Sequence, residues 1–260
     1  MRRILGWLVA AGLGMTPLAV MAQQPIPDYQ VAIGAGGIYK PKYIGSDSYT
    51  VTPWPFIYAD YKDTITLEVG SAWLEPDNLK ISLLKARNYK AGLIATYSEG
   101  RKRGDDTNSR NIHEVDPAVE AGVFFSFFFD NWKFDWNFRQ DVSGAHDGWL
   151  SDFGVTWGAR LAPNVKFEMG PKFTVASKNY MNTEFGITAA DSTASGLQRT
   201  TPDAGIRDAS FGGRLTYNFT ENWFAMAWGQ YMYLLGDAGD SPVAKSQSQI
   251  RMGLMGGYKF

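Results

Sequence analysis

Residues 132–141, WKFDWNFRQD, alternate without a break between two kinds of side chain. One set of alternate positions is aromatic, and the other set is charged or carries an amide. Successive side chains of a β-strand point to opposite faces, so a strand with this sequence has one aromatic face and one polar face. The fold must therefore give the two faces different surroundings, and this requirement constrains the chain more than any other feature.

The alternation recurs along the chain, most clearly in residues 150–161, 165–175 and 211–219. Helical periodicity is not sustained anywhere after the N-terminal stretch, so the pattern predicts an all-β protein. We expect twelve strands, near residues 29–39, 51–61, 64–73, 78–86, 89–98, 115–127, 131–142, 150–161, 165–176, 209–219, 223–235 and 248–260.

The connections between these strands alternate in length. Short connections are expected at 62–63, 87–88, 128–131, 162–164 and 220–222, and the others include long polar stretches at 40–49, 99–114, 177–208 and 236–247, with modest ones near 74–77 and 143–149. A transmembrane β-barrel of the outer membrane sorts its connections in this way. In a soluble β-sandwich the aromatic face would form the core instead. The periodicity fits both folds, and the loop lengths favour a closed antiparallel barrel.

The N-terminus has the features of a secretory signal. Arg2 and Arg3 precede a mostly apolar stretch, and small residues before Gln23 predict cleavage after Ala22. We therefore expect a signal peptide at 1–22 and a barrel at 23–260, exported to the outer membrane of a Gram-negative bacterium.

Charge and cysteine content exclude several classes of protein. Removing Arg2 and Arg3 leaves 23 basic residues against 26 acidic ones, so nothing indicates a nucleic-acid partner. The chain has no cysteine, which excludes disulfides and thiol chemistry.

The charged phase of the strands should line the barrel interior, because an Arg or Lys facing lipid at mid-bilayer costs about 2–4 kcal/mol. Two interpretations of this interior stay open: the charges pair and plug a narrow barrel, or they flank a water-filled pore. The predicted lumen charges are Lys133, Asp135, Arg139, Asp141, Asp152, Arg160, Lys166, Glu168, Lys172, Arg214 and Arg251, with Glu68, Lys80, Glu120 and Lys259 on the same phase.

The last strand ends on an aromatic residue, with Tyr258 and Phe260 on its apolar face. This ending resembles the signal that the barrel-assembly machinery reads in outer-membrane proteins. Lipid and lipopolysaccharide are the other expected partners. The basic residues of 99–110 are candidates for contact with lipopolysaccharide phosphates, and the favoured alternative is a solvated loop.

Signals for catalysis are weak. Ser143, His146 and Asp147 are the residue types of a hydrolase triad, but neighbours in one loop rarely adopt triad geometry, and Gly144 favours a turn. No phosphate-binding or calcium-binding motif is present. We expect no enzyme activity, cofactor or metal.

Pro171 lies mid-strand and predicts a bulge or a misplaced strand boundary.

The chain resembles the MltA-interacting protein family, MipA/OmpV. The resemblance rests on residues 34–60, 143–158, 176–188, 209–223 and 239–249 and on the final YKF, in that order. It implies an outer-membrane barrel that acts as a scaffold between a murein lytic transglycosylase and a murein synthase in peptidoglycan assembly. Other members are described as porin-like, and the alternative is a narrow channel for small polar solutes.

Overall fold

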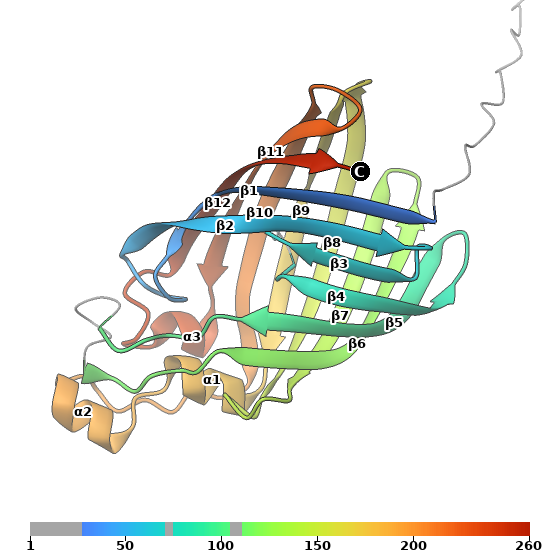
Figure 1. Ribbon diagram of the computed structural model, residues 1–260. Helices are drawn as coiled ribbons and strands as arrows, with labels where there is room; N and C mark the ends of the chain where they lie inside the picture. Colours follow the sequence, from blue (N-terminus) through green and yellow to red (C-terminus); the bar gives the residue numbers. More distant parts are fainter. Residues whose placement is uncertain (1–27, 71–74, 105–110) are drawn as a thin grey trace, which may run out of the picture.

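Twelve antiparallel strands form a closed barrel in the computed structural model, which describes residues 28–70, 75–104 and 111–260 (Figure 1). Each strand pairs with its neighbours in sequence, and the last strand closes on the first. The predicted signal peptide and its cleavage site at Ala22 lie outside the described residues. The strands are β1 Tyr29–Pro41, β2 Tyr49–Tyr61, β3 Ile65–Val69, β4 Asn78–Lys85, β5 Tyr89–Ser98, β6 Ala118–Phe129, β7 Trp132–Asp141, β8 Trp149–Ala162, β9 Val165–Ala176, β10 Gly205–Asn218, β11 Trp223–Leu234 and β12 Ser248–Lys259.

The predicted fold class, a closed antiparallel barrel of about twelve strands, is confirmed. The N-terminus of β1 and the two- to four-residue turns lie at one end, which is the periplasmic end of an outer-membrane barrel. The long loops lie at the opposite, extracellular end (Figure 1).

Three short helices occupy the long loops, where the sequence predicts no regular structure. They are α1 Lys178–Phe185, α2 Ala189–Ser195 and α3 Gly236–Asp240, and they gather at the extracellular end (Figure 1). Their hydroxyl caps explain the first two: Ser177 caps α1, and Thr188 forms a capping box with Asp191 at α2. Helices of five to eight residues are too short to show a helical period in the sequence. None of the described helices is long and apolar enough to cross a membrane.

The outer surface of the barrel carries the apolar phase of the strands. Leu93, Phe125, Phe153 and Phe211 are among the exposed large side chains at mid-strand. Aromatic residues mark both ends, which is typical of the two membrane–water interfaces. Those near the periplasmic end include Tyr29, Tyr61, Trp132, Trp223 and Phe260, and those near the extracellular end include Tyr39, Tyr97 and Tyr233.

Pro171 does not produce the predicted bulge. Strand β9 has the predicted bounds, and its register with β10 passes through Pro171, which lies opposite Phe211. On the other side the register with β8 is the same before and after the proline, from Gly154–Lys172 to Trp157–Met169. Pro171 faces outward, and the ladder absorbs its missing N–H without a shift.

Candidate functional site: the lumen

The two halves of the lumen wall differ in chemistry. On the side of β1, β2, β11 and β12 the inward side chains form an apolar cluster that includes Phe56, Phe224, Trp228 and Met255. On the side of β6 to β10 most inward side chains are charged or polar, with Phe124 as an apolar exception. The barrel interior is thus partly packed like a protein core and partly a polar surface.

A buried ionic network, here called the arginine network, crosses the charged side. The guanidinium of Arg139 donates to Glu120 and, at 2.5 Å, to Asp152. Lys172 lies 3.6 Å from Asp152, and Thr174 donates to the same carboxylate at 2.8 Å. All these side chains are buried, so the mutual pairing offsets much of their desolvation cost.

A β-bulge adds a second arginine to this side. The register between β9 and β10 shifts between Ile206 and Asp208, and both Arg207 and Asp208 are buried. Arg207 donates to Asp208 at 2.6 Å and to the hydroxyl of Tyr180 on α1 at 2.7 Å. This pair is absent from the predicted lumen charges because the predicted strand begins at residue 209, which places both residues in the loop expected at 177–208, whereas β10 begins at Gly205. Strict alternation would also turn only one of two consecutive residues inward.

Nearer the periplasm, Arg214 bridges two carboxylates. It donates to Glu168 at 2.8 Å and to Glu68 at 3.0 Å across the lumen. Lys133 lies 2.9 Å from Asp135.

The predicted lumen charges all lie on the inward phase of their strands, in five settings. Arg139, Asp152 and Lys172 belong to the arginine network, while Lys133, Asp135, Glu168 and Arg214 pair nearer the periplasm. Arg160 and Lys166 are exposed at the periplasmic mouth. Asp141 instead binds the loop that follows β7, and Arg251 lies on the far wall, on β12.

Residues 75–77, which precede β4, lie in the lumen. Gly70, after β3, adopts a φ of +83°, a left-handed conformation that glycine tolerates best. Asp77 accepts hydrogen bonds from the Gly70 amide at 2.8 Å and from the Trp54 indole at 3.3 Å. Glu75 then accepts a hydrogen bond from Lys80 at 2.6 Å and lies 3.9 Å from Lys133.

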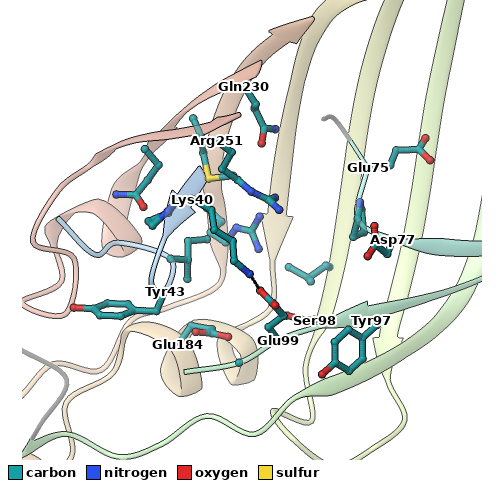
Figure 2. Close-up of a pocket in the computed structure, with 18 of the residues that line it drawn as sticks. Lys40, Tyr43, Glu75, Asp77, Tyr97, Ser98, Glu99, Glu184, Gln230 and Arg251 are labelled. Atoms are coloured by element: carbon teal, nitrogen blue, oxygen red, sulfur yellow. Dashed lines mark hydrogen bonds and ion pairs between the residues drawn. The ribbon is translucent and has the colours of Figure 1, made fainter. Parts of the chain in front are cut away.

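Glu75 marks the point where the internal cavities meet. A cavity of about 230 Å³, here called the outer cavity, lies beneath the loops, and Figure 2 shows side chains that line it. A cavity of about 580 Å³, the periplasmic vestibule, lies at the other end, and a space of about 60 Å³ lies between them. Glu75 lines all three.

The extracellular loops pack over the outer cavity. Tyr180, Met181 and Phe185 of α1 form a buried cluster, the loop cluster, with Leu234 and Ala238. Arg101 is 1% exposed and donates to the main-chain oxygen of Glu184 at 2.7 Å.

The candidate triad residues do not form a triad. The Ser143 hydroxyl donates to Asp141 at 2.7 Å, and the main-chain amides of His146 and Asp147 also donate to Asp141. The His146 ring is buried, 3.4 Å from Glu120. This loop is therefore a turn organised around the Asp141 carboxylate. Among the described residues, no cluster of His, Asp or Glu side chains could hold a metal ion.

A closed barrel with an apolar outer band, aromatic girdles and a charged interior is an outer-membrane β-barrel. The predicted localisation, the outer membrane of a Gram-negative bacterium, is confirmed. Residues 33–260 match the family model of MltA-interacting protein MipA, and the chain belongs to that family. The resemblance found in the sequence is thereby confirmed.

Solved structures of outer-membrane proteins are similar to this chain in architecture. An outer-membrane channel from Pseudomonas putida F1 has a TM-score of 0.48 at 13% identity, covering 90% of this chain and 96% of the other. In-vitro folded OmpT of Vibrio cholerae has a TM-score of 0.37 at 10% identity, covering 91% and 99%. A comparison with curated protein sequences found no match.

Proposed function

We propose that the barrel is a narrow conduit for small polar solutes across the outer membrane, with its constriction at Glu75. The observation that supports this function is the series of three cavities that share Glu75 along the lumen. A carboxylate at the narrowest point, held by Lys80 and Lys133, sets the local electrostatic field that a passing solute meets.

Single-channel conductance in a planar bilayer tests the conduit. We expect a small, steady conductance whose reversal potential under a salt gradient shifts toward anions in Glu75→Gln, because Lys80 and Lys133 then lose their counter-charge. Glu221→Gln is the matched control, since Glu221 is exposed in a periplasmic turn. A silent bilayer, with folding verified by heat-modifiable gel migration, contradicts the conduit.

Scaffolding of murein enzymes is the second candidate function, and the family description, MltA-interacting protein, favours it. The periplasmic turns have two to four residues, so a partner would dock on the barrel rim. Cysteine crosslinking from Asn131 and Asn164, in two of these turns, tests this function. Capture of a murein lytic transglycosylase from both positions, but not from extracellular Arg199, supports it; equal capture from all three positions argues against it.

A further inference from the structure

Arg251 lines the outer cavity and makes no direct ion pair with any carboxylate among the described residues. Four of the five carboxylates that line the cavity have a basic partner: Glu75 with Lys80, Glu99 with Lys40, Glu120 with Arg139, and Glu184 with Arg101. The fifth, Asp77, accepts hydrogen bonds from the neutral Gly70 amide and Trp54 indole. Arg251 lines the same cavity, yet no hydrogen bond or ion pair of its side chain to any described residue is found. Its guanidinium lies 5.9 Å from the centre of the Trp228 indole ring, and Glu99 and Asp77 attract its charge without a direct ion pair.

The neighbouring strands place no carboxylate directly opposite Arg251. On β11 the residue directly opposite Arg251 is Gln230, a neutral amide. Cross-strand neighbours have Cβ atoms roughly 5 Å apart, so this position is where a paired carboxylate would be expected. On the other side, pairing of β1 with β12 runs to Tyr39, and the next inward residue, Lys40, is itself basic and bound to Glu99.

The wall behind the guanidinium is flat and apolar. The Trp228 indole lies over Gly253, where a Cβ atom would come within 2.3 Å of the indole nitrogen, so only glycine fits. Ile38, Trp54 and Met232 also line the outer cavity. Figure 2 shows Arg251 extending from the wall that carries Gln230 into the space between Lys40 and Glu75.

We propose that the outer cavity binds a small organic carboxylate, with the Arg251 guanidinium as its anion-binding group. The planar fork of a guanidinium matches a carboxylate with two parallel hydrogen bonds, and the aromatic and aliphatic wall contacts the carbon chain of the solute. The volume of about 230 Å³ is smaller than that of a typical site for a drug-sized ligand, so it suits a small solute. This inference names the solute class of the conduit and depends on that proposed function for its role in transport.

Isothermal titration calorimetry of the full-length protein, folded in detergent, tests the site with butyrate and its neutral analogue butyramide. We expect butyrate to bind and butyramide to bind at least tenfold more weakly, because only the anion pairs with Arg251. Arg251→Gln should weaken butyrate binding about tenfold or more, and Arg251→Lys should restore part of it. Lys259→Gln is the matched control: Lys259 faces inward on the same strand but lies outside the outer cavity.

Three results overturn the carboxylate site: no butyrate binding, equal binding of butyrate and butyramide, or unchanged binding in Arg251→Gln. Chloride that competes as well as butyrate overturns the preference for a carboxylate. Folding of each variant is verified by heat-modifiable migration, and Arg251→Lys keeps the test valid if Arg251→Gln does not fold. If butyrate binds but the barrel does not conduct, the conduit function is rejected and the carboxylate site stands. If the barrel conducts but butyrate does not bind, only the carboxylate site is rejected.

Discussion

At the scale of single residues, one face of each strand meets lipid and the other faces the lumen. Two phenylalanines of β6 test this assignment, because they lie on opposite faces. Phe125 of β6 is 41% exposed on the outer surface, while Phe128 of the same strand lines the periplasmic vestibule. We expect Phe125→Arg to lower the free energy of unfolding in lipid by about 2–4 kcal/mol, because the charge then faces hydrocarbon.

Phe128→Arg is the matched control, since it places the same charge in a wet cavity. Urea titration of both variants in phospholipid vesicles measures the difference. Losses of equal size would show that the assignment of the lipid and lumen faces is wrong.

Arg139 illustrates the cost of breaking a buried ionic network. Its guanidinium is shared between Glu120 and Asp152, and all three side chains are buried. Arg139→Ala leaves two carboxylates with reduced compensation and should cost about 3–5 kcal/mol of stability. Replacing exposed Arg160 with Ala should cost less than about 1 kcal/mol. Urea unfolding midpoints compare the two, and similar values would mean that the network contributes little.

At the scale of elements, strands with unlike faces could be predicted from the sequence, and the inward position of residues 75–77 could not. Strands β5 and β9 have the predicted bounds, because polar and apolar residues alternate along them. Strand β11 is apolar on both faces, with Phe224 and Trp228 inside and Tyr231 outside, so alternation does not show which face is the lumen.

The residues missed in the lumen share a physical cause. Glu75 lies in the lumen because Asp77, two residues later, accepts hydrogen bonds from Gly70 and Trp54. Trp54 and Asp77 are 23 residues apart in the sequence. Arg207 faces inward because of a bulge. Both depend on tertiary contacts, which local sequence patterns do not encode.

The capping box of α2 predicts a pH dependence of the longest loop. Burial raises the pKa of the Asp191 carboxyl, but hydrogen bonds from Thr188 and His113 outweigh burial and lower the pKa from 3.8 to about 2. A pKa that is lower in the folded state adds stability above pH ~4, and this stability is lost as pH falls toward 2. Amide hydrogen-exchange protection of residues 188–196 should therefore hold from pH 7 to 5 and decrease below pH 4.

Asp191→Asn should lower that protection at pH 7, by about 1 kcal/mol in the free energy of local opening. Asp203→Asn is the control, because Asp203 lies in the same loop with its side chain 73% exposed. Equal protection in the two variants would exclude a role for the capping box.

At the scale of the whole molecule, the barrel is asymmetric along its axis. The periplasmic vestibule of about 580 Å³ lies at the end with short turns, and the outer cavity of about 230 Å³ lies beneath the helical loops. Twelve strands make a barrel wider than the eight whose interior side chains fill, and narrower than the sixteen to eighteen of aqueous porins. The helical loops and residues 75–77 therefore decide how much of the lumen is open.

Replacing residues 178–203 with a short Gly-Ser linker should raise the conductance several-fold. The replacement removes Tyr180, Met181 and Phe185, so the loop cluster over the outer cavity loses its α1 side chains. Removing only 189–196 is the matched control, because α2 contributes no residue to that cluster. The control should keep the conductance of the intact protein, since α1 still covers the cavity. Equal conductance of both variants and the intact protein would mean that the loops do not limit flow, and would leave Glu75 as the controlling constriction.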